Sequence, residues 1–398
     1  MRAPRAAIEI ASSHRGTVIA TTNTVAIRLA AFYGVYFAYA GVMAPFWPVW
    51  LASRGVGPAE VGLILAAGQW VRVATGPAIA ALTDRWGRRR RMMLTLSLLA
   101  FVAYAACNTA VGFWQLLALS ALAGSATGAL LPIGETVTLA HAYRHKLDYG
   151  RIRLWGSLTF IGASAAVGYG VKLGGIDAAL LAILAALAAT VLVSLALPRP
   201  PLRPPTPRRG LAAIVANRTL LAFALCAGLI QASHAMFYGF SSLHWRGQGI
   251  GGGMIGLLWA AGVLAETILF TFSNRVVDRL GIVGLLRLAA AAGLLRWLAF
   301  AADPGLGWLF PLMTLHAFTF GATHLATMHA ITRLAPPESA ATAQALYSAG
   351  TGVLMGAAAS LSGFLYEGVG VAGYFAMAGL AVAAGAVTLR LAEPQRVP

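Results

Sequence analysis

Residues 61–87 read VGLILAAGQWVRVATGPAIAALTDRWG, and residues 255–281 read IGLLWAAGVLAETILFTFSNRVVDRLG. The two stretches align without a gap, 194 positions apart, and each is an apolar helix followed by Asp-Arg-x-Gly. They share Gly62, Leu63, Ala66, Ala67, Gly68, Asp84, Arg85 and Gly87 at equal offsets. The chain is therefore two copies of one unit, each about half its length. A duplicated apolar unit of this kind is typical of membrane transporters.

The composition excludes an ordinary soluble domain. The 398 residues are 59% hydrophobic and only 10% charged, with a mean hydropathy of +0.75, whereas soluble proteins carry about 25% charged residues. The net charge of +17 would suit nucleic-acid binding, but the basic residues gather in alternate short loops, as in polytopic membrane proteins. We expect the lipid bilayer as the surroundings and no nucleic-acid partner.

About twelve stretches are long and apolar enough to span a bilayer, which takes about 20 residues. They are 26–50, 58–82, 91–110, 113–139, 151–172, 176–197, 218–244, 253–275, 282–302, 306–332, 340–365 and 371–391. The loops after the odd-numbered spans carry Arg54, Lys172 and Arg246, and the many other loop arginines follow the even-numbered spans. This bias predicts a multi-pass protein of the inner (cell) membrane with both termini in the cytoplasm.

The spans form two halves around a proline-rich segment. Residues 198–210 read PRPPLRPPTPRRG, and proline at this density favours an extended spacer. The predicted fold is an all-α integral membrane protein with two pseudo-symmetric six-helix halves. Its parts are an N-terminal cytoplasmic segment (1–25), a first half (26–197), a cytoplasmic linker (198–217), a second half (218–391) and a tail (392–398).

The loop after the second span, Asp84-Arg85-Trp86-Gly87-Arg88-Arg89, resembles the signature loop of the major facilitator superfamily. Asp278-Arg279-Leu280-Gly281 matches the same signature less completely. The resemblance implies the major facilitator fold and alternating access of the two halves. We expect this loop to serve gating and helix-end charge balance rather than substrate chemistry. The gating residues are Asp84, Arg85, Gly87, Arg88, Asp278 and Arg279.

A narrower resemblance starts from residues 148–157, which read DYGRIRLWGS at the start of the fifth span. It also includes Ser233-His234-Ala235, Leu243-His244-Trp245 and the stretch 315–324, LHAFTFGATH. Together these are similar to the phenylpropionate permease family, relatives of the lactose permease type of proton symporter. This resemblance implies proton-coupled uptake of an aromatic acid such as 3-phenylpropionate.

Glu135 and Arg153 are candidate substrate-binding residues in the first half. The fourth and fifth spans run antiparallel, so both side chains lie at a similar depth and can meet. An arginine–carboxylate pair can grip a polar solute with several directed hydrogen bonds. The sugar-binding pair of lactose permease has the same sequence separation, and Gly150-Arg151-x-Arg153 matches its motif. The alternative is a structural ion pair near the cytoplasmic surface.

Further candidates line the expected substrate path. Arg72 lies midway along the second span and would hold either a substrate carboxylate or a carboxylate of the protein. Tyr36 belongs to an aromatic group in the first span that would suit a ring, although aromatic residues also pack helices. His234 and Tyr238 are four residues apart in the seventh span, where they would either line a cavity or pack against neighbouring helices.

Glu266, Arg296, His316 and His324 are candidates for proton coupling. Glu266 lies midway along the eighth span, and removal from water favours the neutral form of a carboxyl group. Arg296 and His316 have the relative spacing of the coupling arginine and histidine of lactose permease, but Thr319 stands where that protein has a second carboxylate. His316, Phe320 and His324 share one helix face, and histidine titrates near neutral pH. The alternative is a structural Glu266–Arg296 ion pair.

The motifs of an enzyme or of an ATP-driven pump are absent from the sequence, and no metal motif or cofactor motif is present. We therefore expect a monomeric transporter whose partners are a small solute and protons, driven by the proton gradient and without a cofactor. An aromatic carboxylate is the first candidate solute. A sugar or nucleoside is the second, because Glu135 suits hydroxyl groups and repels an acid. Proton-driven drug export is the third.

Overall fold

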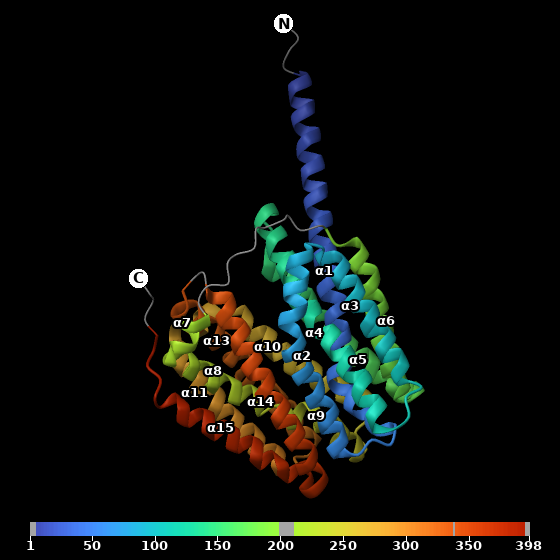
Figure 1. The fold of residues 1–398 in the computed structure, drawn as a ribbon, viewed down its shortest axis with the longest axis vertical. Helices are drawn as coiled ribbons and strands as arrows, with labels where there is room; N and C mark the ends of the chain where they lie inside the picture. Colours follow the sequence, from blue (N-terminus) through green and yellow to red (C-terminus); the bar gives the residue numbers. More distant parts are fainter. Residues whose placement is uncertain (1–4, 199–210, 337–338, 395–398) are drawn as a thin grey trace.

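The computed structural model describes residues 5–198, 211–336 and 339–394, and within these ranges the chain is helical without a strand. Figure 1 shows α1–α6 on one side of the molecule and the later helices on the other. The first group comprises α1 (Arg5–Ser53), α2 (Pro58–Trp86), α3 (Arg89–Cys107), α4 (Gly112–His145), α5 (Tyr149–Gly174) and α6 (Asp177–Ala196). The second comprises α7 (Leu211–Ala216), α8 (Arg218–Ala232), α9 (Ala235–Gly247), α10 (Gly252–Thr271), α11 (Ser273–Ala301), α12 (Leu306–Thr314), η1 (Ala317–Gly321), α13 (Ala322–Leu334), α14 (Ala340–Val369), η3 (Gly370–Gly373) and α15 (Tyr374–Thr388).

In the described part of the chain, ten helices are long and apolar enough to cross a membrane, against about twelve expected spans. The two numbers differ for two local reasons. The predicted tenth span is divided into α12, the π-helical turn η1 and α13, each too short to qualify alone. The predicted eleventh and twelfth spans, α14 and α15, are joined through η3 into one continuous stretch. The expected all-α membrane architecture is confirmed.

The predicted domain boundaries can be compared with the helices and the described residues at three segments. Helix α1 begins at Arg5, so it extends through most of the predicted N-terminal segment. Residues 199–210 of the predicted linker lie outside the described residues, and the linker's last part contains the short helix α7. Residues 395–398 of the predicted tail also lie outside the described residues.

Two seams of small residues join the halves. Helix α2 packs on α14, where a side chain at Gly62 would come within 2.8 Å of the Ala359 carbonyl oxygen. Helix α5 packs on α10, where Ser164 donates a hydrogen bond of 3.0 Å to the Gly256 carbonyl oxygen. A side chain at Gly168 would collide with the Gly252 backbone. Glycine at these positions lets the helix backbones touch, as is common between membrane helices.

The seams are closed at one end of the molecule only. We call the end of the molecule that carries residues 84–91 and 275–279 the basic end. Toward that end, Gly76 in α2, which lies fourteen residues after Gly62 and on the same side of the helix, has open space where a side chain would stand, and Figure 1 shows the two halves diverging. The two halves therefore separate toward the basic end and pack tightly at the opposite end.

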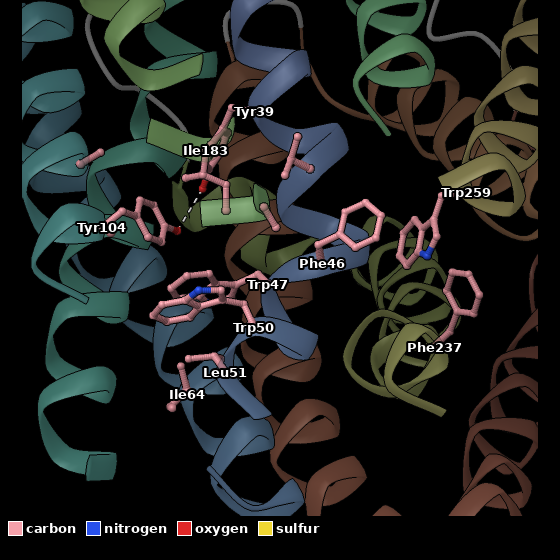
Figure 2. Packing of buried hydrophobic residues seen from close by; sticks show 14 of the residues in the cluster. Tyr39, Phe46, Trp47, Trp50, Leu51, Ile64, Tyr104, Ile183, Phe237 and Trp259 are labelled. Atoms are coloured by element: carbon pink, nitrogen blue, oxygen red, sulfur yellow. Dashed lines mark hydrogen bonds between the residues drawn. The ribbon is translucent and has the colours of Figure 1, made fainter. Parts of the chain in front are cut away.

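Aromatic residues fill the core near the closed end, as Figure 2 shows. Trp47 and Trp50 stack with their ring centroids 4.9 Å apart, and the Tyr39 and Tyr104 hydroxyl oxygens lie 3.0 Å apart. Phe46 of the first half belongs to the same buried cluster as Trp259 of the second. The hydrophobic core is thus continuous across the two halves at this end.

Candidate functional site

Arg296 of α11 is the centre of the second-half site. Its side chain is fully buried, with the guanidinium carbon 4.5 Å from the centroid of the Phe237 ring and 4.9 Å from that of the Trp297 ring. Such cation–π contacts stabilise a desolvated arginine. Among the described residues Arg296 forms no ion pair with a carboxylate, so the alternative, a structural Glu266–Arg296 pair, is not formed in this structure.

A chain of polar contacts links Arg296 to Glu266 through His316. The Arg296 Nη1 atom lies 3.4 Å from His316 Nδ1, and His316 Nε2 lies 3.6 Å from Glu266 Oε2. Arginine only donates, so His316 Nδ1 must accept and the ring proton of neutral His316 is assigned to Nε2. His316 thus points an N–H at the Glu266 carboxyl group. The structure brings these three predicted coupling residues together, with the histidine in the middle.

Thr319 extends the chain toward the seventh predicted span. Arg296 donates to its hydroxyl oxygen over 3.2 Å, and that oxygen lies 2.9 Å from His234 Nε2. His234 Nδ1 lies 2.9 Å from the Ile230 carbonyl oxygen, which only accepts. The Thr319 hydroxyl therefore donates to Nε2 of neutral His234. The sequence analysis noted only that Thr319 stands where lactose permease has a carboxylate. The hydrogen bonds of Thr319 in this network were not predicted.

A π-helical turn shapes the site. It covers Ala317–Gly321, and π-turns inside helices are frequent at functional sites. The His316, Phe320 and His324 rings still form one stack, with centroids 5.1 and 6.3 Å apart. A side chain at Gly321 would lie 2.9 Å from Leu269 and 3.5 Å from the Glu266 side chain. Glycine therefore lets Glu266 pack beside the turn.

Tyr238 lies on the other side of the same network. Its ring stacks on His234 with a centroid distance of 5.6 Å and approaches the His316 ring at 6.4 Å. The two residues predicted as cavity lining, His234 and Tyr238, are therefore part of the network around Arg296.

In the first half, Arg153 and Glu135 lie in the same neighbourhood without forming a direct ion pair among the described residues. The Arg153 guanidinium carbon lies 3.9 Å from the Phe37 ring centroid and 5.4 Å from that of Tyr33. The Tyr149 hydroxyl donates to Glu135 Oε1 over 3.5 Å. The expected contact between the two charges is not formed. The Arg153 guanidinium packs against aromatic rings instead, and the Glu135 carboxylate accepts a hydrogen bond from Tyr149.

Arg72 lies nearer the middle of the same half. It donates to the Gln69 side-chain oxygen and packs against Gly128. Its described neighbours include no carboxylate in ion-pair contact. The Tyr36 ring lies 5.4 Å from Phe37 and 6.1 Å from Phe32. Arg153 thus packs against aromatic rings, whereas the described contacts of Arg72 are with Gln69 and Gly128.

Both signature turns contain a glycine with positive φ, but the ψ of Gly87 is 9° and that of Gly281 is 178°, and the two turns have different partners. Gly87 has φ 61° and Gly281 has φ 68°, a left-handed conformation that glycine adopts at low cost. Asp84 pairs with Arg89 at 3.2 Å. In the second copy, Glu393 accepts from the backbone N–H groups of Ile282 and Val283 at 2.7 and 2.9 Å.

Glu393 was not predicted, because nothing in the sequence of the tail marks it as a partner of the second signature turn. It also pairs with Arg333 at 3.5 Å. The other predicted gating residues, Arg85, Arg88, Asp278 and Arg279, take part in no ion pair within the described ranges. Those ranges also hold no group of three His, Cys, Asp or Glu side chains suited to a metal ion.

Comparison with known proteins agrees with this architecture. The chain is 33% identical to the probable 3-phenylpropionic acid transporter of Escherichia coli (strain K12), over 89% of this chain and 95% of that protein. It is 29% identical to the maltose permease of Geobacillus stearothermophilus, over 84% of this chain and 86% of that protein.

Solved structures show the same fold. The nucleoside transporter NupG matches with a TM-score of 0.78 at 16% identity, covering 92% of this chain and 98% of its own. An inward-facing bacterial homologue of the human lysosomal transporter Spinster matches with a TM-score of 0.74 at 13% identity, covering 93% and 96%. The family model described as the MFS_1 like family covers residues 26–377. The chain therefore belongs to the MFS_1 like family, and it is a major facilitator permease, a membrane transporter rather than an enzyme.

Proposed function

We propose that this permease imports a small aromatic carboxylate, such as 3-phenylpropionate, together with protons. The observation that carries the proposal is Arg153, a cation packed against the Phe37 and Tyr33 rings without a carboxylate bound to it, and Arg72 is a second cation of the same half without an ion-paired carboxylate. A guanidinium binds a carboxylate with two parallel hydrogen bonds, and the surrounding rings suit an aromatic group. The relative named as a probable 3-phenylpropionic acid transporter supports the same solute class.

Proton coupling is assigned to the Glu266–His316–Arg296 network, with His324 in the adjoining ring stack. A carboxyl group beside a neutral histidine and a buried cation can exchange a proton without leaving an isolated charge in the membrane. In this scheme the basic end is the cytoplasmic side, as the loop charges suggest. The separation of the halves at that end then represents an inward-facing state. The working unit is a monomer, and the proton gradient supplies the energy.

A second solute class has its own support. Glu135 accepts a hydrogen bond from Tyr149 and would do the same from a sugar hydroxyl, and the maltose permease relative belongs to this class. Transport of a nucleoside rests on fold similarity alone, and drug export has no further support.

Uptake into proteoliposomes tests the proposal. With an acidic outside, labelled 3-phenylpropionate should accumulate, and a proton ionophore should abolish the accumulation. 3-Phenylpropanol, which has the ring without the carboxylate, should not compete. Accumulation of maltose instead would favour the sugar alternative. Extrusion of dyes without uptake of either solute would contradict both proposals.

A further inference from the structure

The inference concerns the outer surface of α10. Leu257, Leu264 and Ile268 are each about half exposed on this helix. At 3.6 residues per turn, the three side chains lie within about 40° of one another and about 160–200° around the helix from Glu266. They also lie about 80–120° away from Gly256, which forms the seam with α5. The three residues, which we call the apolar stripe, therefore face away from both the polar network and the other half, toward the lipid.

The apolar stripe leads to an open hollow at the junction of α10 and α11. The hollow has a volume of about 360 Å³ and is lined by Phe272, Arg275, Val276 and Arg279. The Arg275 guanidinium carbon lies 5.8 Å from the Phe272 ring centroid, so this ring joins the apolar stripe to the first arginine. The predicted eighth span ends at Arg275, which places the hollow at the basic end of the membrane, at the level of the lipid headgroups.

The two arginines carry charge that the protein does not neutralise. Neither Arg275 nor Arg279 forms an ion pair among the described residues, and Asp278, which lies between them in the sequence, forms none there either. The arginines are four residues apart, so they lie on the same side of the helix one turn apart. Guanidinium groups bind phosphate oxygens with charge-assisted hydrogen bonds. The hollow therefore offers two donors to one phosphate group.

The hollow belongs to the second copy of the repeat alone. At the positions of Phe272 and Arg275, 194 residues earlier, the first copy has Ala78 and Ala81. The Asp-Arg-x-Gly signature is common to both copies, and Arg279 is part of it. The aromatic ring and the first arginine of the hollow are thus additions to the shared unit, and the signature does not account for them.

The dimensions of the surface match one lipid leaflet. Half of a hydrocarbon core of about 30 Å is about 15 Å, which corresponds to about ten residues of helix. Counting back from Arg275, this length ends close to Leu264, the middle residue of the apolar stripe. An acyl chain whose phosphate lies in the hollow would therefore contact Phe272, Ile268 and Leu264 in turn.

We propose that the hollow binds the phosphate of an anionic phospholipid, whose acyl chains lie along Phe272, Ile268 and Leu264. Basic hollows at the cytoplasmic ends of membrane helices suit anionic headgroups. A zwitterionic headgroup would bring its ammonium group toward two guanidinium groups, so an anionic lipid binds better. A soluble phosphate would leave the apolar stripe without a role. The site lies on the lipid side of α10, away from the substrate path, and does not depend on the identity of the solute.

Native mass spectrometry of the purified protein in a neutral detergent tests the site, with phosphatidylglycerol as the probe. One arginine near an anionic lipid changes the affinity about fivefold. Arg275→Gln should therefore weaken the tightest phosphatidylglycerol binding about fivefold, and Arg275→Gln with Arg279→Gln about 25-fold. Phosphatidylcholine with the same acyl chains should bind weakly to the wild type. Equally tight binding of the two lipids would overturn the proposal.

The matched control is the double variant Arg90→Gln and Arg91→Gln. It removes the same charge from the basic end of the first half, far from the hollow in the sequence. It should bind phosphatidylglycerol like the wild type. Equal weakening in the two double variants would mean that binding follows the net charge, and would overturn a site at the hollow.

A phosphatidylglycerol with a photoreactive group in its acyl chain locates the site. In the wild type, the label should be found within residues 264–279. The double variant Phe272→Ala and Arg275→Ala, which has the residues of the first copy, should lose this label. Both replaced side chains are exposed, so its unfolding temperature in lipid-free detergent should equal that of the wild type.

Two outcomes of the labelling would overturn the proposal. The first is equal labelling of residues 70–85, the corresponding stretch of the first copy, because the hollow would then have no special affinity. The second is loss of the label when inorganic phosphate is added in millimolar excess, because the hollow would then be a site for soluble anions. We expect neither outcome, since the acyl chains supply part of the binding and only the second copy has the hollow.

Discussion

At the residue scale, the second-half site depends on a single hydroxyl group. Thr319 accepts from Arg296 and donates to His234, so it connects a buried cation to a histidine on another helix. Replacing the hydroxyl by a methyl group of similar size leaves both partners buried without it. An unpaired buried polar group costs about 1–3 kcal/mol, so a single atom at this position has a large effect on the network.

We therefore predict that Thr319→Val lowers the thermal unfolding temperature in detergent and slows uphill uptake, because Arg296 and His234 lose a partner. Thr319→Ser, which keeps the hydroxyl, should behave like the wild type in both measurements. Equal stability of the valine and serine variants would show that the contact is not important.

Glu266 supplies a second prediction at this scale. Glu266→Gln removes the ionisable group but keeps its size, so the variant should lose uphill uptake, with the concentration ratio across the membrane falling to about one. Exchange of labelled for unlabelled solute should continue. The measurement is uptake and counterflow in proteoliposomes, and uphill accumulation by the variant would refute the coupling role.

At the element scale, the turn at Gly281 within α11 is held by Glu393 near the C-terminus. Gly281 has φ 68°, and a side chain there would lie 2.9 Å from the Glu393 carboxylate. Glu393 in turn accepts from the first N–H groups after the turn, where a helix start favours negative charge. The second signature turn is thus held by a residue more than a hundred positions away in the sequence.

We predict that Gly281→Ala destabilises the protein by about 1–3 kcal/mol, because a backbone with φ 68° and ψ 178° is almost exclusive to glycine, and by more because the methyl group displaces Glu393. In a Glu393→Ala background the second cost disappears, so the same substitution should have a smaller effect. Thermal unfolding of the four proteins measures this coupling. Strictly additive effects would mean that the tail and the turn are independent.

At the scale of the whole molecule, the glycine seams favour the state in which the halves separate toward the basic end. A side chain at Gly256 would collide with the Ser164 backbone, whereas Gly162, which lies about 160° around α5 from Ser164 and outside the seam, has open space. A larger residue at Gly256 therefore opposes closure of the far end, and one at Gly162 does not.

We predict that Gly256→Val shifts the population away from the inward-facing state. The readout is the labelling of Arg72→Cys by an impermeant thiol reagent applied at the basic end, which should slow several-fold. Gly162→Val should leave the labelling rate unchanged. Equal rates in the two variants would contradict a role for this seam in setting the conformation.

Much of the fold and part of the site could be predicted from the sequence. Apolar runs of membrane length, the 194-residue repeat and the alternation of loop charge determine the helical architecture and its two halves, because these properties depend on composition and spacing alone. The same local logic singled out Arg72, Glu135, Arg153, Glu266 and Arg296, since a charge inside a membrane span is costly wherever it occurs.

Only the tertiary structure decided which of these groups meet. Arg296 contacts aromatic rings and His316 instead of pairing with Glu266, Arg153 rests on Phe37 instead of pairing with Glu135, and Glu393 reaches the second signature turn. These contacts depend on the rotation and depth of each helix and on a π-turn that alters the register within one of them. Helix rotation and register follow from the packing of all neighbours together, so no local pattern in the sequence encodes them.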